Sequence, residues 1–303
     1  MKDLKNKNCL LTGAAAGIGR SLAFELAKEG VNLFLADINM AKLEKVKDEL
    51  GEYGVKVFTG RCDVSKYEDF EKLVDNFYSK FGELDILINN AGIAGGGFIE
   101  TLSLEEWKRV IDVNLWSIIY SIKVFLPKML ERGEGYIVNT ASGAGVVGLP
   151  FHIQYVASKF GVVGISEALY SELNQRGIDV SVICPSHVKT DIIERSNIVI
   201  PPNLKLGETQ QEINKKLVQF KEIFWEKYNE DGITADQAAR KYIKGIKKRK
   251  LYIFDRRLLS FAQFFKSISE RIYKWILRRL GREYIKLIEE VLTEMGIDYG
   301  ELI

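Results

Sequence analysis

Short apolar runs and amphipathic stretches alternate along the first 255 residues of the chain. Apolar runs bounded by turn-forming residues are typical of buried strands, and the segments between them carry apolar residues at helical spacing. This alternation predicts an α/β protein with a Rossmann-type, doubly wound sheet of seven parallel strands and helices on both faces. The predicted strands are 9–12, 31–36, 55–59, 84–88, 136–142, 179–184 and 251–254. Helical patterns are clearest at 67–81, 105–131, 209–228 and 234–250.

Glycine and acidic residues follow the first two predicted strands. Gly13, Gly17 and Gly19 lie between a strand and a helix, where main-chain amides at the helix N-terminus can hold a pyrophosphate. The alternative is a tight turn with no ligand, but the flanking strand and helix favour the binding turn. Asp37 ends the second strand, where a carboxylate accepts hydrogen bonds from a ribose 2′-hydroxyl and repels a 2′-phosphate. The sequence therefore predicts NAD in preference to NADP, with capping of a helix near Met40 as the competing role of Asp37.

A serine, a tyrosine and a lysine form a candidate group for proton transfer. Ser142 ends the fifth predicted strand, and Tyr155 and Lys159 are four residues apart, on one face of a helix. Free tyrosine titrates near ~10, and a nearby ammonium favours the phenolate. We therefore expect Lys159 to lower the pKa of Tyr155, while Ser142 orients a substrate oxygen. A Tyr-x-x-x-Lys pair alone occurs by chance in many helices, so its meaning depends on the motifs upstream.

Composition narrows the class of protein without naming a partner. The chain has 303 residues, of which 47% are hydrophobic and 28% charged, and its net charge is +2. Three widely spaced cysteines and two histidines predict neither a disulfide framework nor a metal site. The N-terminus lacks the apolar centre of a signal peptide, and no run reaches the roughly 18 uncharged apolar residues of a membrane span. A cytoplasmic location is therefore expected.

Together these motifs resemble those of a classical short-chain dehydrogenase/reductase over about residues 4–255. The matching positions are Thr12-Gly13-x-x-x-Gly17-Ile18-Gly19, Asp37, Asp63, Asn89-Asn90-Ala91-Gly92, Asn114, Ser142, Tyr155-x-x-x-Lys159, Pro185 and Thr190. The resemblance implies hydride transfer between the nicotinamide and a carbon that bears an oxygen, with Tyr155 exchanging the proton. The implied catalytic residues are Asn114, Ser142, Tyr155 and Lys159, and Asn114 would hold a water that connects Lys159 to solvent.

The resemblance also implies the cofactor contacts. Asp63 and Val64 would meet the adenine, Lys159 would bind the nicotinamide ribose, and Val188 and Thr190 would contact the carboxamide. The full predicted set is Gly13, Ala15, Gly17, Ile18, Gly19, Asp37, Asp63, Val64, Asn90, Ala91, Gly92, Tyr155, Lys159, Pro185, Val188 and Thr190.

Two residues after the sixth predicted strand depart from the family pattern. The family usually has glycine after the strand-ending proline, whereas this chain has Ser186 followed by His187. Neither residue removes a catalytic group, and His187 is a candidate for contact with the substrate. The predicted substrate contacts are therefore Ser142, Tyr155 and His187, whereas His152 is expected to lie in a loop or at a helix start.

The segment 190–232 lies where the family builds a lid over its substrate. It is rich in apolar residues, which are Ile192, Ile193, Ile198, Val199, Ile200, Pro201, Pro202 and, on the 209–228 helix, Ile213, Leu217, Phe220 and Phe224. Further apolar residues precede Tyr155, namely Val146, Val147, Leu149 and Phe151. These patterns favour a bulky hydrophobic alcohol or ketone, steroid-like or lipid-like. The alternative is that the helix simply packs its apolar stripe on the domain.

Residues 256–303 form a helical extension beyond the catalytic domain of residues 1–255. Residues 247–286 hold 13 Lys and Arg against 3 acidic residues, a net charge of +10, whereas the rest of the chain holds 30 against 38, a net charge of −8. An apolar stripe runs through Leu258, Phe261, Phe265, Ile268, Ile272 and Ile276. Peripheral membrane contact through 256–286 and packing on the lid or a second subunit are equal alternatives. Nucleic acid is not expected, because no recognised binding fold accompanies the charge.

Three functions remain open on sequence grounds. The first is an NAD(H)-dependent oxidoreductase acting on a hydrophobic secondary alcohol or ketone. The second is a 3-oxoacyl thioester reductase, whose basic surface would receive an acidic carrier protein. The third is a non-catalytic, membrane-associated module that binds a dinucleotide. The complete catalytic set favours an enzyme, and the family's habit of forming dimers and tetramers implies a homo-oligomer.

Overall fold

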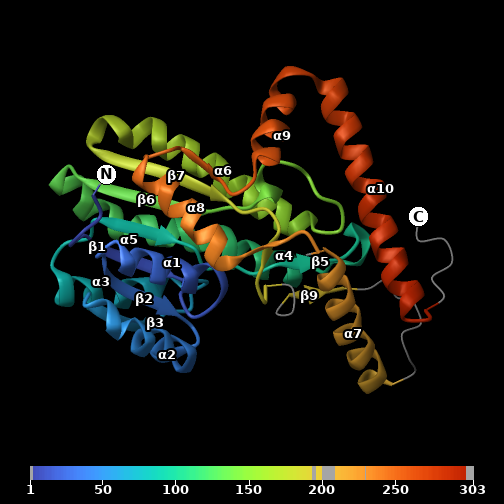
Figure 1. Cartoon of the computed structure of the whole chain (residues 1–303), viewed down its shortest axis with the longest axis horizontal. Coiled ribbons are helices and arrows are strands. Elements are labelled where there is room, and N and C mark those ends of the chain that lie inside the picture. The colour runs from blue at the N-terminus through green and yellow to red at the C-terminus, as the bar shows by residue number, and fades with distance from the viewer. Residues whose placement is uncertain (1–2, 193–195, 200–208, 229, 298–303) are drawn as a thin grey trace.

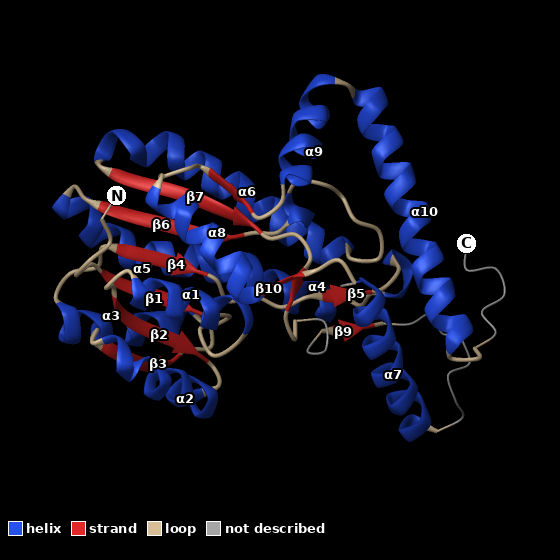
Figure 2. Cartoon of the chain, viewed as in Figure 1, coloured by secondary structure: helices blue, strands red, loops and turns tan. Residues whose placement is uncertain are grey.

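The computed structural model describes residues 3–192, 196–199, 209–228 and 230–297. Its centre is a parallel seven-stranded sheet with the strand order β11-β7-β6-β4-β1-β2-β3 (Figures 1 and 2). The strands are β1 (Asn8–Thr12), β2 (Asn32–Asp37), β3 (Val57–Arg61), β4 (Ile86–Asn89), β6 (Gly135–Thr140), β7 (Ile178–Cys184) and β11 (Tyr252–Phe254). This confirms the predicted fold, although β3 and β4 begin two residues later than the sequence indicates.

Helices cover both faces of the sheet. They are α1 (Gly17–Lys28), α2 (Met40–Leu50), α3 (Tyr67–Phe81), α4 (Leu104–Ile111), α5 (Ser117–Arg132), α6 (Ile153–Leu173) and α8 (Ala235–Lys247). Successive strand residues point to opposite faces. In β1, Cys9 and Leu11 accordingly join a core cluster with α1, α2 and α8, whereas Leu10 joins a second cluster with α3 and α5.

The helix predicted over 105–131 consists of three segments. A π-helical turn, Asp112–Trp116, separates α4 from α5 and carries the fully buried Asn114. Turns of this kind are frequent at functional sites. Within the described residues, the run Leu104–Arg132 is the one helix long and apolar enough to span a membrane. Its buried side chains pack into the two clusters on this side of the sheet, as those of a core helix in an α/β domain do.

The order of the strands reverses at β1. From β1 the chain proceeds outward through β2 and β3, and β4 then pairs with the other edge of β1 to begin the second half of the sheet. Such a reversal leaves a crevice at the carboxyl ends of the two central strands. The glycine turn follows β1 and Asn90 follows β4, so the predicted site lies at this crevice.

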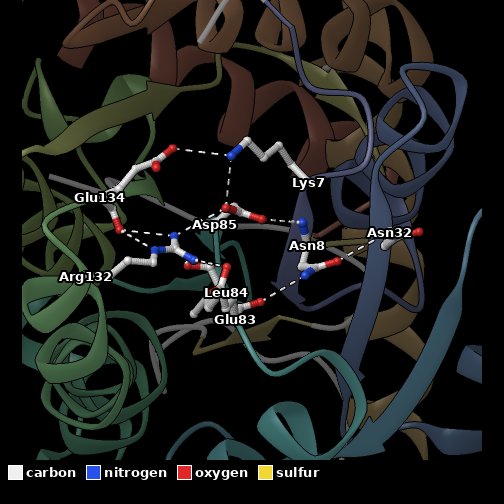
Figure 3. Close-up of polar contacts among 8 residues, drawn as sticks. All are labelled: Lys7, Asn8, Asn32, Glu83, Leu84, Asp85, Arg132 and Glu134. Carbon is white, nitrogen blue, oxygen red and sulfur yellow. Dashed lines mark hydrogen bonds and ion pairs between the residues drawn. The ribbon is translucent and has the colours of Figure 1, made fainter.

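A polar network closes the opposite, amino-terminal end of the sheet (Figure 3). Asp85 is 6% exposed, and its Oδ2 accepts a hydrogen bond from the main-chain N–H of Asn8 at 2.8 Å. Its Oδ1 accepts from Lys7 Nζ at 3.2 Å and from Arg132 Nη2 at 3.3 Å. Arg132 also donates to the carbonyl oxygens of Leu84 and Glu134. The network joins the starts of β1, β4 and β6 far from the crevice, and so serves stability.

Replacing Asp85 by Ala is expected to lower the free energy of unfolding by about 2–3 kcal/mol with little change in kcat. The substitution leaves the partly buried donors that bind the carboxylate without an acceptor. Urea unfolding monitored by circular dichroism measures this change. Glu83→Ala is the matched control, since Glu83 is largely exposed and its ion pair with Arg132 is worth no more than about 1 kcal/mol. Equal effects of the two substitutions would contradict a stabilising role for Asp85.

Two short parallel strand pairs connect the lid region to the domain. β5 (Gly95–Gly96) pairs with β9 (Asn197–Ile198), and β8 (Val188–Lys189) pairs with β10 (Ile233–Thr234). The predicted lid helix is confirmed as α7 (Gln210–Tyr228). The predicted lid residues Ile193, Ile200, Pro201 and Pro202 lie outside the described residues.

The extension folds into α9 (Arg257–Ile268) and α10 (Glu270–Glu294), which form a hairpin whose turn lies away from the sheet (Figure 1). The C-terminal part of α10 packs beside α7, where Tyr284 and Ile288 share a core cluster with Phe220 and Phe224. The beginning of α10 instead packs on the loop after β6, around Val146. The extension is therefore built onto the catalytic domain and its lid.

The face of the hairpin that packs inward differs from the predicted stripe. Leu258, Phe261, Ile268 and Ile272 are exposed, and Phe265 and Ile276 are half-buried. The contacts to the loop after β6 come from other residues, namely Ala262, Tyr273, Leu277 and Leu280. Packing of the predicted stripe on the lid, one of the two sequence-based alternatives, is therefore wrong.

Candidate active site

The turn between β1 and α1 brings main-chain groups close to the crevice. Gly13 and Gly17 have φ angles of +66° and +53°, which favour glycine. A Cβ atom on Gly19 would lie 1.9 Å from the carbonyl oxygen of Gly13, so only glycine fits there. The N-cap of α1 is Ala16, which has no side-chain acceptor for the first amides of the helix. These amides fit the pyrophosphate of a dinucleotide.

Asp37 lies beside this turn, at the carboxyl end of β2. Its Oδ2 accepts a hydrogen bond from the main-chain N–H of Ala15 at 3.0 Å, and its Oδ1 accepts from that of Asn39 at 2.9 Å. Asn39 is the N-cap of α2, since its Oδ1 accepts from the N–H of Lys42 at 3.1 Å. The competing prediction, that Asp37 caps α2, is therefore wrong. Asp37 lines the crevice, as a ligand for a ribose requires.

Asn90 connects the ends of the two central strands. Its Nδ2 donates to the carbonyl oxygens of Thr12 and Gly13, at 3.1 and 3.2 Å, and its main-chain N–H donates to Thr12 Oγ1 at 3.0 Å. Asn90 thereby fixes the start of the glycine turn against β4.

A single cavity of about 430 Å³ gathers nearly all of the predicted site residues. The predicted residues that line it are Gly13, Gly17, Ile18, Gly19, Asp37, Asp63, Val64, Asn90, Ala91, Gly92, Ser142, Tyr155, Lys159, Pro185, His187, Val188 and Thr190. Ala15 and Asn114 lie behind its wall. Ala15 acts through the hydrogen bond to Asp37 described above.

The candidate catalytic groups meet where β6 ends and α6 begins. Lys159 is almost fully buried, its Nζ donates to the carbonyl oxygen of Thr140 at 2.9 Å, and it lies 5.6 Å from the centre of the Tyr155 ring. The Oγ of Ser142 accepts from the main-chain N–H of Ala144 at 3.1 Å, so its own hydroxyl hydrogen is left for another acceptor. The geometry places a proton donor, an orienting hydroxyl and an ammonium at one end of the cavity.

Asn114 braces the strand end beside Lys159. Its Oδ1 accepts from the main-chain N–H of Ile93, and its Nδ2 donates to the carbonyl oxygen of the same residue, both at 2.9 Å. Nδ2 also donates to Ser158 Oγ at 3.0 Å. A Cβ atom on Gly92 would lie 3.2 Å from Asn114 Oδ1 and 3.4 Å from Lys159 Nζ, so both groups border one small space. The role of Asn114 in holding a water there stays a prediction.

Burial controls the charge states of Tyr155 and Lys159. It lowers the pKa of Lys159 to about 8. It raises the pKa of Tyr155, and a hydrogen bond with the hydroxyl of Ser142 opposes this rise. The predicted net lowering of the Tyr155 pKa is therefore wrong for the protein alone, because the loss of hydration on burial is the largest influence on this group.

Carbonyl reduction is expected to slow as the pH rises above about 8. Tyr155 still holds its proton in this range because its pKa is raised, whereas Lys159 loses its positive charge with a pKa of about 8. We expect kcat/KM for reduction to be level between pH 6 and 7 and to fall about tenfold per pH unit at high pH. A steady-state pH–rate profile measures this, with enzyme samples returned to pH 7 to check that inactivation is reversible. A profile that stays level to pH 10 would show that the charge on Lys159 is not needed.

The loop after β7 accommodates the unusual Ser186. The main-chain N–H of Ser186 donates to both carboxylate oxygens of Asp255 at 3.1 Å, and its Oγ donates to Oδ2 at 2.9 Å. The serine therefore fixes this loop to the end of β11. His187 follows in the cavity wall, with its ring 4.3 Å from that of Tyr228. Burial lowers the pKa of His187, which keeps it neutral at pH 7.

Aromatic side chains that were not predicted as site residues line the cavity beside Tyr155. Trp225 and Tyr228 of α7 line it together with His152, which was expected to lie in a loop or at a helix start. His152 is the N-cap residue of α6, but it is buried and its Nδ1 contacts the carbonyl oxygen of Gly95 at 2.7 Å. Aromatic spacing on α7 could have marked Trp225 and Tyr228, but the sequence pattern alone favours core packing for such residues.

The extension contacts this part of the cavity from outside through Tyr284. A carbonyl oxygen only accepts, so Nδ1 of His152 carries the proton and Nε2 accepts from the hydroxyl of Tyr284. Burial lowers the pKa of His152, which agrees with a neutral ring. The ring of Tyr284 also packs against those of Phe224 and Tyr228, at 5.8 and 5.9 Å. Helix α10 thus supports the part of the cavity lining that Trp225 and Tyr228 form, the aromatic wall.

Comparison with known proteins agrees with this geometry. Residues 7–198 match the short chain dehydrogenase family. The chain is 39% identical to a cyclohexanol dehydrogenase of Acinetobacter sp. (strain SE19) over 211 residues, which are 68% of this chain and 84% of that one. It is 37% identical to a 3-oxoacyl-[acyl-carrier-protein] reductase of Staphylococcus epidermidis over 191 residues, 62% and 77% of the two chains.

The fold has a close counterpart among solved structures. A short-chain dehydrogenase/reductase from Burkholderia phymatum, in complex with NAD, matches with a TM-score of 0.74 and 31% identity and covers 88% of this chain and 94% of its own. The glycine turn, the acidic end of β2 and the buried Tyr-Lys pair are the features that such a cofactor and its chemistry require. The protein therefore belongs to the short-chain dehydrogenase/reductase family and is a nicotinamide-dinucleotide oxidoreductase that acts on CH–OH groups.

Proposed function

We propose that this protein interconverts a secondary alcohol and a ketone on a hydrophobic, steroid-like or lipid-like substrate. The observation that carries the proposal is the composition of the cavity beside Tyr155. Leu149, Ile192, Trp225 and Tyr228 face the same space as the catalytic tyrosine. A polar substrate would lose hydration against such walls without gaining hydrogen bonds in return.

The chain's own residues supply proton transfer and orientation. When bound, the nicotinamide ring supplies or accepts the hydride. Tyr155 gives its hydroxyl proton to the substrate oxygen in reduction and takes it back in oxidation. Ser142 donates to the same oxygen and holds it beside Tyr155. Lys159, fixed by the carbonyl of Thr140, places a positive charge near the phenol and favours the phenolate form that proton transfer creates.

We propose NAD(H) as the preferred form of the cofactor. Asp37 is held at the glycine turn by two main-chain hydrogen bonds, so its carboxylate cannot easily turn away from a ribose. Its charge would repel a 2′-phosphate. Arg20 and Arg61 are cations near this end of the cavity, but they pair with Glu49 and Asp69 respectively. Neither arginine is therefore without an acidic partner, as a cation that binds a 2′-phosphate would be.

A spectrophotometric assay tests both proposals. The panel contains steroids, long-chain secondary alcohols and their ketones, and small polar ketones, each with NAD(H) and with NADP(H). We expect kcat/KM to be at least tenfold higher with NAD(H), and at least 100-fold higher for the bulky apolar compounds than for the polar ones. Preference for NADP(H) would refute the role of Asp37, and preference for small polar ketones would refute the role of the aromatic wall.

Reduction of a 3-oxoacyl thioester is the second candidate. The similarity to a 3-oxoacyl-[acyl-carrier-protein] reductase and the net charge of +10 over residues 247–286 favour it. The same assay with 3-oxoacyl thioesters on a carrier protein and on a short thiol distinguishes the two functions. Faster reduction on the carrier protein, with no activity on steroids or free alcohols, would replace the leading proposal.

A further inference from the structure

The outer face of the α9–α10 hairpin carries a concentration of exposed apolar side chains. Within the described residues, fourteen large apolar side chains are exposed, and six of them lie between residues 258 and 275. They are Leu258, Phe261, Phe264, Ile268, Ile272 and Trp275, with exposed fractions from 41% to 73%. They lie on α9 and on the first two turns of α10, and the turn between these helices lies apart from the sheet in Figure 1. Clusters of this kind mark interaction surfaces.

Packing of the hairpin on its own domain does not account for these residues. A separate set makes the inward contacts, such as Tyr273 and Leu277, which pack on the loop that contains Val146. Leu259 also faces inward, since its Cδ2 lies 3.0 Å from where a Cβ of Gly143 would be. The hairpin therefore has two apolar faces. One packs on the domain, and the other is left exposed by the residues that the structure describes.

The segment that carries the outer face is positively charged. Residues 256–286 hold nine Lys and Arg and two acidic residues, a net charge of +7. The two acids, Glu270 and Glu283, each pair with a cation one turn away on α10, Lys274 and Arg279. Arg271, Arg278 and Arg282 are exposed on α10 and form no ion pair with any residue in the described ranges. The uncompensated charges thus lie next to Ile272 and Trp275.

We propose that this outer face lies in the interface of an anionic lipid bilayer. Aromatic and aliphatic side chains would enter the boundary between headgroups and acyl chains, while the arginines bind lipid phosphates. A second copy of this chain fits less well, because each face carries the same +7 charge. Contact would hold the enzyme at the membrane through an element that also supports its substrate cavity.

Co-sedimentation of the full chain with vesicles tests the proposal. We expect binding to vesicles of phosphatidylcholine with 30% phosphatidylserine at about 0.1 M salt, at least tenfold weaker binding to pure phosphatidylcholine, and weaker binding as salt is raised. Trp275 is expected to shift its fluorescence to shorter wavelength on binding, and Trp275→Phe should remove that shift. Absence of sedimentation with anionic vesicles would overturn the proposal.

Paired variants separate the two kinds of contact. The triple variant Phe261→Ser, Phe264→Ser, Ile268→Ser and the triple variant Arg271→Gln, Arg278→Gln, Arg282→Gln should each weaken binding about 100-fold, since each contact contributes close to a factor of five. The control for the apolar variant is the double variant Leu104→Ser, Val218→Ser, which changes exposed apolar residues elsewhere. The control for the arginine variant is the triple variant Lys42→Gln, Lys45→Gln, Lys72→Gln.

Cofactor binding shows whether each variant is folded, because none of the substituted residues lies in the cavity. If the hairpin variants bind vesicles as the controls do, the proposal is wrong. If the wild-type protein forms concentration-dependent oligomers that the apolar triple variant loses, and neither binds vesicles, the face is an interface between copies of this chain.

Discussion

Replacing Tyr155 by Phe is expected to lower kcat by at least 1,000-fold and to change the dissociation constant for NADH by no more than about threefold. The substitution removes the hydroxyl that exchanges a proton with the substrate, and general acid–base catalysis contributes 10²–10⁴-fold. The ring stays in the cavity wall, so the nearby site residues keep their packing. Lys159 also keeps its bond to Thr140 and stays available to the cofactor. Initial rates with an apolar ketone, and titration of NADH fluorescence, measure the two quantities.

Tyr170→Phe provides a matched control for this experiment. Tyr170 is on the same helix but is exposed and outside the cavity, so kcat should stay within twofold of wild type. Activity of Tyr155→Phe within tenfold of wild type would require another proton donor, and His187 is one candidate in the cavity wall. No measurable turnover in wild type, together with tight NADH binding, would instead favour a non-catalytic module.

The parts of the site that follow a strand end could be predicted from the sequence. Gly13, Asp37, Asn90 and Ser142 each stand next to a buried strand, and parallel strands bring their carboxyl ends to one edge of the sheet. Tyr155 and Lys159 are fixed relative to each other by helical spacing alone. These relations are local or follow from the sheet topology, so the pattern of the chain determines them.

Contacts between distant elements could not be predicted in the same way. His152 and Tyr284 are 132 residues apart, and no period in the sequence relates them. The π-helical turn around Asn114 could not be predicted either, because Leu104–Arg132 has the composition of one continuous helix. The pKa of Tyr155 likewise depends on burial by residues from several elements, so the effect of one lysine could not decide it.

The extension shows a different limit of sequence patterns. Its residues 257–280 carry apolar side chains on more than one side, so helical periodicity identifies faces but not which of them packs inward. The predicted stripe contains Leu258 and Ile272, which are exposed, whereas Ala262 and Tyr273 make the contacts. Which face is buried depends on the shape of the loop after β6, and that shape is a property of the folded domain.

Replacing Tyr284 by Ala is expected to lower kcat/KM for a bulky apolar substrate about 100-fold, mainly through KM, although Tyr284 lies outside the cavity. The substitution removes a buried ring that packs against Phe224 and Tyr228, and it leaves Nε2 of His152 without its donor. Loss of a ring of this size from a core costs about 3–5 kcal/mol, enough to loosen α10 from α7. Substrate saturation kinetics measure KM, and NADH titration shows whether the crevice is intact.

Tyr284→Phe separates packing from hydrogen bonding. It keeps the ring but removes the hydroxyl, so only the bond to His152 is lost, with an expected effect on kcat/KM of about tenfold or less. A larger loss in Tyr284→Ala than in Tyr284→Phe, with NADH affinity unchanged in both, would show that α10 shapes the substrate end of the cavity through its aromatic packing. If both variants keep the KM of the wild type, the aromatic wall is held by α7 alone and the extension has no part in substrate binding.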